Sequence, residues 1–163
     1  MQKAPVLAND KERVCALEGL KLLDTASEER FDRLTKEATS RFSVPISTIT
    51  LIDKDREWFK SAQGLQAKEG PRNVSFCGHA LISQIVMIIP DTLTDSRFAD
   101  NPMVKGDPFI RFYAGKSLYD HDSKLPVGVF CIKDHKPREM STKDLNDFLD
   151  LADRAEKEIN KHI

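Results

Sequence analysis

The sequence Ser75-Phe76-Cys77-Gly78-His79-Ala80-Leu81 places an aromatic ring, a thiol and an imidazole within four residues of one another. An apolar run, Ile85–Ile89, follows and ends at Pro90-Asp91. The polar segment Asp95–Pro102 then leads to Arg111-Phe112-Tyr113-Ala114-Gly115. A hydrophobic core alone would not need the His, Arg and Asp side chains of this region. The stretch therefore predicts the wall of a pocket built between short strands.

Helices are predicted at both ends of the chain. Residues 11–23 form the first, and Ser27 caps a second that carries Glu28 and Glu29 in its positive first turn. Ser141 caps a long final helix. The buried faces of the three helices are predicted from apolar residues at helical spacing: Ala16, Leu17, Leu20 and Leu23; Phe31, Leu34, Ala38 and Phe42; Leu145, Phe148, Leu149, Ala152, Ala155 and Ile159.

Two hairpins are predicted between these helices. The first pairs residues 46–53 with 57–62, and the second pairs 111–119 with 125–133. The segment 65–73 is predicted to be a loop. Ser75 is expected to cap a short helix over 76–83, and 85–89 reads as a short buried strand. The segment 90–109 is expected to be mostly loop with one helical turn near Arg97, and a loop of this length is usually functional.

This element order predicts an α+β fold with a central antiparallel sheet. The helices at the chain ends cover one face of the sheet, while the short helix and the loops roof a pocket on the other face. Residues 1–9 are predicted to be a flexible tail and 10–163 a single domain, since 163 residues suit one compact unit.

Composition narrows the function classes. The chain is 40% hydrophobic and 31% charged, and its formal net charge of −1 does not favour general binding to nucleic acid or to a membrane. No apolar run approaches the roughly 18 residues of a membrane span, and the first residues do not resemble a signal peptide. Cys15, Cys77 and Cys131 are odd in number and far apart, which predicts reduced thiols and a cytoplasmic protein.

The ordered set of motifs over roughly residues 10–160 resembles one bacterial subgroup of GAF domains. The resemblance rests on Phe31-Asp32-Arg33-Leu34, Val44-Pro45-Ile46, Leu51-Ile52-Asp53, Trp58-Phe59-Lys60-Ser61, Gly64-Leu65, Ser75-Phe76-Cys77-Gly78-His79-Ala80, Ile89-Pro90-Asp91, Arg97-Phe98-Ala99-Asp100-Asn101-Pro102, Ile110-Arg111-Phe112-Tyr113-Ala114-Gly115 and Gly128-Val129-Phe130-Cys131-Ile132-Lys133-Asp134. The runs Gly115-Lys116-Ser117-Leu118 and Leu125-Pro126-Val127-Gly128 depart from the usual pattern, which puts an inherited ligand preference in doubt.

The resemblance implies a sensory or regulatory domain of signal transduction. Such domains bind small ligands, among them cyclic nucleotides, tetrapyrroles, haem, amino-acid-like molecules and anions. The resemblance also implies a homodimer formed through the terminal helices and an output domain, or a kinase or cyclase partner. It identifies neither a ligand nor a cofactor for this chain. An interaction module without a ligand is a further alternative.

The candidate pocket residues are Phe76, Cys77, His79, Asp91, Phe98, Phe109, Arg111, Tyr113 and Phe130. Each also has a structural interpretation. The aromatic residues could be ordinary core, and Cys77 a small buried hydrophobe. Arg111 could clamp an anionic ligand or form a structural ion pair with Asp91, Asp95 or Asp100.

Three chemical functions of the Cys77 segment are less favoured. On a helix, Cys77 and His79 point about 200° apart and cannot chelate one ion, so no metal site is expected. Bilin attachment is disfavoured because Gly78 separates the two residues. Free methionine-(R)-sulfoxide reductases carry a Cys-Gly-Thr-Ala segment where this chain has residues 77–80, but their second cysteine has no counterpart in 91–109. We therefore expect no enzyme activity, with a thiol-based reductase as the alternative.

Overall fold

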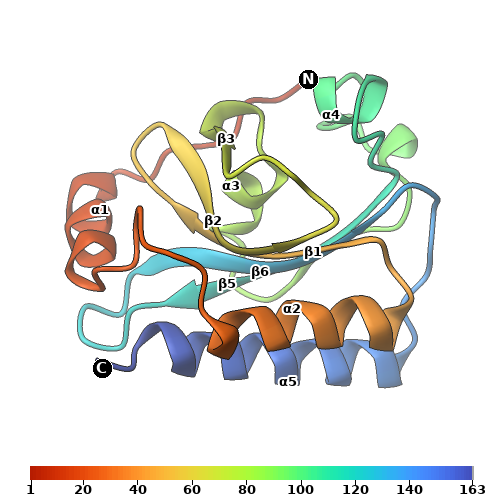
Figure 1. The fold of residues 1–163 in the computed structure, drawn as a ribbon. Helices are drawn as coiled ribbons and strands as arrows, with labels where there is room; N and C mark the ends of the chain where they lie inside the picture. The colour runs from red at the N-terminus through yellow and green to blue at the C-terminus, as the bar shows by residue number, and fades with distance from the viewer. Residues whose placement is uncertain (163) are drawn as a thin grey trace.

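Six antiparallel strands form one sheet at the centre of the molecule in a computed structural model that describes residues 1–162 (Figure 1). The strands follow the order β3-β2-β1-β6-β5-β4 across the sheet, and every neighbouring pair is antiparallel. Their bounds are β1 Ile46–Ile52, β2 Arg56–Gln63, β3 Glu69–Pro71, β4 Met87–Ile89, β5 Phe112–Tyr119 and β6 Pro126–Asp134. The two predicted hairpins are β1–β2 and β5–β6. They are joined at the centre of the sheet, where β1 pairs with β6.

Helices α2 (Glu29–Phe42) and α5 (Thr142–Ile159) lie side by side on one face of the sheet (Figure 1). The opposite face carries the short helices α3 (Phe76–Ala80) and α4 (Pro102–Lys105) and single 3-10 turns at Arg72–Val74 and Thr92–Thr94. These positions confirm the predicted α+β fold with its two differently covered faces. Among residues 1–162, none of the helices combines the length and the apolar character that crossing a bilayer requires.

Strand alternation divides the buried side chains into two cores. Ile49, Leu51 and Phe130 face α2 and α5, and the Phe130 ring lies 5.5 Å from that of Phe148. The neighbouring residues of β1 and β6 point to the other face, because successive side chains of a strand alternate. There they meet a second cluster built around Phe76.

Helix α1 (Asp10–Gly19) does not join the α2–α5 layer but lies at one end of the sheet (Figure 1). Arg13 holds it there: this fully buried side chain donates to the Ile52 carbonyl at 2.7 Å. Asp10 pairs with Arg13 at 2.7 Å and with Arg72 at 2.8 Å. The first predicted helix is shorter than 11–23, but its predicted apolar face is confirmed, because Leu17 and Leu20 are buried in the helix-side core and Ala16 and Leu23 pack against it. The buried Arg13 adds a polar anchor that the apolar pattern did not predict.

Two of the three predicted helix caps are confirmed. The Ser141 hydroxyl accepts from the Asp144 backbone, and Asp144 accepts from the Ser141 backbone in a capping box. The Ser75 hydroxyl accepts from Gly78 N at 2.9 Å. The prediction for Ser27 is wrong, because the residue that precedes α2 is Glu28, and it makes no side-chain cap.

The helical turn expected near Arg97 is confirmed, because Ala99 N donates to the Asp95 carbonyl at 2.9 Å, and helix α4, which Asn101 caps, follows it. Three further expectations differ from the structure. The loop 65–73 contains strand β3, which pairs with β2. Ile85 is 73% exposed, and the buried strand starts at Met87. Residues of the predicted tail lie against the domain, since Ala4 is buried and its backbone donates to the Asn73 carbonyl at 2.9 Å.

Candidate functional site

A cavity of about 740 Å³ lies between the sheet and the loops on the face opposite α2 and α5. Its floor comes from β2 and the end of β6, and its walls come from the loops before α3 and around α4. The lining residues are Glu57, Phe59, Gly64, Leu65, Gln66, Ala67, Glu69, Gly70, Pro71, Val74, Pro102, Met103, Asp107, Pro108, Ile110, Lys133 and His135. The position agrees with the pocket predicted between sheet and roof, but none of the predicted pocket residues is among those that line it.

Glu57 is the most unusual of these residues. It lies on β2 with its side chain on the cavity face, because its neighbour Trp58 packs toward the helices. Glu57 is only 3% exposed, and its Oε1 atom has no hydrogen-bond partner among residues 1–162. Burial raises the pKa of this carboxyl to about 8, although the positive charge of Lys133 acts in the opposite direction.

Lys133 is a second buried charge on the same floor. It is 2% exposed on β6, and its Nζ atom lies 5.9 Å from the centroid of the Tyr113 ring. Burial lowers the pKa of Lys133, but the neighbouring acidic groups of Cys131, Cys77 and Glu57 act in the opposite direction and raise it above its ordinary value. No side chain among residues 1–162 forms an ion pair with Lys133.

Cys77 and Cys131 lie close together in the roof-side core, on the same face of the sheet as the cavity. Both thiols are fully buried, and Tyr113 Oη donates to Cys77 Sγ at 3.2 Å. The Cys131 sulfur is 2.9 Å from Thr48 Oγ1. Burial raises the pKa of Cys77, which keeps its thiol protonated. This contact between the two cysteines was not predicted, because 54 positions of sequence separate them.

Most of the predicted pocket residues fill the roof core rather than line the cavity. The Phe76 ring stacks on Phe98 at 4.4 Å and on Tyr113 at 5.2 Å. His79 packs on the edge of Phe98 at 4.7 Å, and its Nε2 atom lies 3.0 Å from the Gln2 carbonyl. Close packing leaves no space between these rings, so they shape the roof from inside.

The remaining predicted residues lie elsewhere. Phe130 faces the helix-side core, because it is out of phase with Cys131 and Lys133 on β6. Phe109 is 54% exposed. Arg111 pairs with Asp91 at 3.1 Å in a partly exposed ion pair, which is the structural interpretation of these two residues. None of these four residues lines the cavity.

Strand phase could have identified the true floor. Glu57 and Lys133 are charged residues at inward positions of strands whose other inward residues are apolar or small. A charged residue at such a position is buried unless it lies at a sheet edge or in a cavity. Within residues 1–162 there is no group of three or more His, Cys, Asp and Glu side chains placed to hold a metal ion.

Comparison with known proteins supports the fold. A cyclic di-GMP phosphodiesterase of Pseudomonas aeruginosa is 37% identical to this chain over 138 residues. The match covers 85% of this chain but only 23% of the phosphodiesterase, so the chain spans less than a quarter of that relative. No protein-family model matches the chain.

Two solved structures resemble the chain over most of its length. One is the GAF domain of a phosphoenolpyruvate-protein phosphotransferase from Acinetobacter, with a TM-score of 0.65, 13% identity and coverage of 91% of this chain and 92% of that one. The other is a type II free methionine-R-sulfoxide reductase from Thermoplasma acidophilum, with a TM-score of 0.64, 11% identity and coverage of 88% and 94%.

Proposed function

We propose that this chain, whose fold is that of a GAF domain, is a sensory or regulatory domain that binds a small molecule in the 740 Å³ cavity. The observation that carries the proposal is the unpartnered carboxyl of Glu57 on the cavity floor. A buried polar group without a hydrogen bond costs roughly 1–3 kcal/mol, and a ligand that supplies the missing partner offsets this cost. A cavity of this size with a few converging polar groups is typical of small-molecule sites.

The sheet offers a route from the cavity to the helices. Strand β2 carries Glu57 on the cavity face and Ser61 on the helix face, where the Ser61 hydroxyl donates to Asp32 of α2 at 2.6 Å. Helix α2 is in turn tied to α5 by the pair of Glu37 with Arg154 at 3.1 Å. A shift of β2 on ligand binding would therefore change how α2 and α5 pack. We propose these two helices as the output of the domain.

The partner is proposed from the relative. The domain would form a homodimer through α2 and α5 and control an output domain, or a separate kinase or cyclase. The Pseudomonas aeruginosa relative is a cyclic di-GMP phosphodiesterase, which makes an enzyme of cyclic-dinucleotide turnover the first output to examine. The buried free thiols of Cys77 and Cys131 suit the reducing cytoplasm.

A thiol enzyme is the second candidate, because the structure brings Cys131 into contact with Cys77. A pair of adjacent thiols could form a disulfide during turnover, which a lone cysteine could not. Both thiols are fully buried, however, and a substrate would have to open the roof to reach them. Replacing Cys77 with Ser should abolish such an activity, whereas it should leave ligand binding in the cavity largely intact.

Native mass spectrometry beside a denatured run tests the proposal. We expect extra mass in the native run only, which is the mark of a non-covalent ligand. Ala67→Trp, which fills the cavity, should remove the extra mass, whereas Ala26→Trp on an exposed loop should not. A native mass equal to that of the chain alone, both as purified and after incubation with a metabolite extract, would contradict the proposal. Extra mass that survives denaturation would favour the thiol enzyme.

A further inference from the structure

The floor of the cavity presents two buried ionisable side chains, one acidic and one basic, on either side of β1. Glu57 on β2 lies opposite Ile52, at one end of β1, and Lys133 on β6 lies opposite Ile46, at the other end. Both side chains line the same cavity. Glu57 and Lys133 therefore reach the cavity from opposite ends of β1.

The two charged groups do not satisfy each other. No ion pair joins Glu57 and Lys133, so their charged atoms are more than 4.0 Å apart. Glu57 Oε1 has no hydrogen-bond partner, and nothing among residues 1–162 accepts a hydrogen bond from Lys133 Nζ. A buried ion is retained at a substantial free-energy cost unless a counter-charge reaches it. In the empty protein Glu57 avoids this cost near neutral pH by keeping its proton, as its raised pKa indicates, and a cationic group bound beside it would let it ionise.

We infer that the cavity binds a small zwitterion, with its ammonium group against the Glu57 carboxylate and its anionic group against Lys133 Nζ. This inference rests on the proposed function and names the ligand class. The ligand's ammonium donates to the unpartnered oxygen of Glu57, and its carboxylate or other anion accepts from Lys133. Both buried charges then have the partner that each lacks in the empty protein.

Singly charged ligands fit the floor less well. An anion would satisfy Lys133 but leave Glu57 without a donor, and a cation would satisfy Glu57 but meet the like charge of Lys133. The anion thus leaves buried Glu57 without a partner, and the cation leaves buried Lys133 without one. A site with two such groups discriminates strongly against ligands that satisfy only one of them.

The charges around the rim weigh against a ligand rich in phosphate. The ionisable residues that line the cavity are Glu57, Glu69, Asp107, Lys133 and His135. Acidic side chains outnumber the permanently cationic ones, and no arginine of the described chain lines the cavity to bind a phosphate in bidentate fashion. Phe59, Leu65 and Met103 supply apolar wall for the body of the zwitterion.

Thermal shift and isothermal titration calorimetry with defined probes test the inference. The probes are the free α-amino acids and a series of unbranched ω-amino acids of increasing length. Each is compared with its N-acetyl derivative, which lacks the ammonium, and with its amide, which lacks the carboxylate. We expect at least one zwitterion to bind, and removing either of its charges to weaken binding at least tenfold.

The variants Glu57→Gln and Lys133→Met should each weaken binding of that zwitterion at least tenfold. Glu12→Gln is the matched control, because Glu12 is exposed on α1 and does not line the cavity. It should change the affinity less than twofold. If a variant at the floor fails to fold, the comparison of charged and blocked ligands on the unchanged protein still decides the question.

The inference is overturned if no zwitterion of the series binds, or if a blocked derivative binds as well as its parent. The same experiments distinguish a failure of the zwitterion inference from a failure of the proposed sensory function. If a singly charged or neutral molecule binds and Ala67→Trp abolishes its binding, the sensory proposal stands and the zwitterion inference is wrong. If no small molecule binds, both are wrong.

Discussion

Glu57 shapes both the pH dependence and the ligand dependence of the protein. Its carboxyl has a pKa raised from 4.5 to about 8 by burial, with a further raising effect from Cys77 and a lowering effect from Lys133. The unfolded chain therefore loses the Glu57 proton at a lower pH than the folded protein does. The contribution of this group to the free energy of unfolding is fully present below pH 4.5. It falls as the pH rises from 4.5 to about 8, and it is lost above about pH 8.

Glu57→Gln should remove this pH dependence, because the amide does not titrate. The variant's advantage in free energy of unfolding should grow from near zero at pH 5 to as much as about 5 kcal/mol at pH 9. Urea denaturation of both proteins at pH 5, 7 and 9 measures the difference. Glu69→Gln should run parallel to the unchanged protein, and a Glu57→Gln curve that does so too would show that Glu57 has an ordinary pKa.

The three thiols should differ sharply in reactivity. Cys15 is exposed on α1, whereas Cys77 and Cys131 are fully buried. A chromogenic disulfide reagent should modify one thiol rapidly in the folded protein and the other two only in urea. Cys15→Ser should abolish the fast phase. Rapid modification of Cys77 in the folded state would mean that the roof opens readily, which would strengthen the thiol-enzyme alternative.

At the residue scale, the sequence predicts which side chains are buried. It does not predict whether a buried side chain lines a cavity or fills the core. Phe76, Phe98 and Tyr113 are buried as their apolar character indicates. Whether an inward ring lines a cavity or fills it depends on how closely neighbouring elements approach, which no local pattern encodes. The apolar pattern of β2 and β6 predicts the strands but not the charged residues Glu57 and Lys133 at their inward positions.

Helix α5 depends on its N-terminal capping box. Ser141→Ala removes the hydroxyl that accepts from Asp144 N at 3.0 Å. We expect a loss of about 1 kcal/mol in the free energy of unfolding, measured by urea denaturation. Thr142→Ala, one position along and exposed, should change stability by less than about 0.5 kcal/mol. Equal effects of the two substitutions would show that the cap does not stabilise the helix.

The turn after β2 requires glycine at position 64. Gly64 has φ +80°, and a Cβ atom there would clash with the Pro45 carbonyl oxygen. Gly64→Ala should destabilise the protein by at least about 1 kcal/mol in thermal or urea unfolding.

Gly19 provides the contrast, since it is helical and nothing lies within 4 Å of an added Cβ. Gly19→Ala should be neutral or stabilising by up to about 1 kcal/mol. If Gly64→Ala proves equally harmless, the strain assigned to this turn is absent.

At the element scale, long periodic segments were predictable and short ones were not. The β5–β6 hairpin and helix α5 follow from alternation and from helical spacing sustained over many residues. Strand β3 has only three residues and contains Gly70-Pro71, so its own sequence indicates a loop. It exists because β2 offers a free edge to pair with, which is a tertiary cause.

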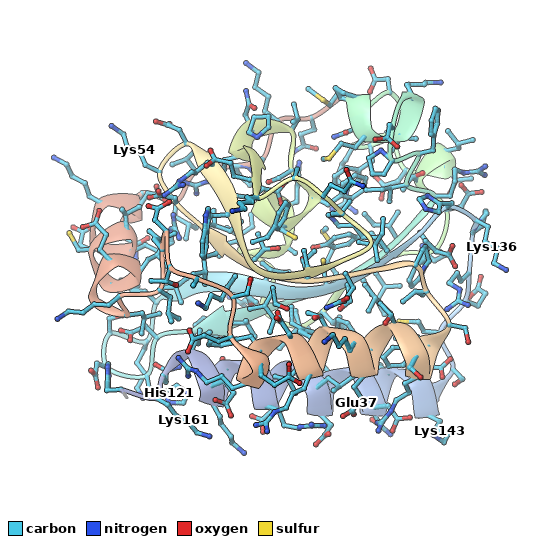
Figure 2. The ribbon with its side chains drawn as sticks, in the orientation of Figure 1. Glu37, Lys54, His121, Lys136, Lys143 and Lys161 are labelled. Carbon is cyan, nitrogen blue, oxygen red and sulfur yellow. The ribbon has the colours of Figure 1, made fainter. Side chains whose placement is uncertain are left out.

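For the whole molecule, the order of the elements was enough to predict the two-faced α+β architecture, while the position of α1 required the structure. The outer side of α2 and α5 is charged: Lys143 of α5 points away from the sheet, and Arg154 of α5 pairs with Glu37 of α2 (Figure 2). The apolar stripes of both helices are used in covering the sheet. A homodimer through these helices would therefore be held mainly by polar contacts, and its assembly should weaken as salt rises.

Hydrogen exchange followed by mass spectrometry tests most directly the claim that the cavity binds a ligand and the helices report it. The sample in which native mass spectrometry detects a bound small molecule is compared with the same protein after the ligand is removed. We predict slower exchange in the cavity loops 65–74 and 102–110 when the ligand is present, together with altered exchange in α2 and α5. Unchanged exchange in the cavity loops with a ligand known to be bound would contradict the account.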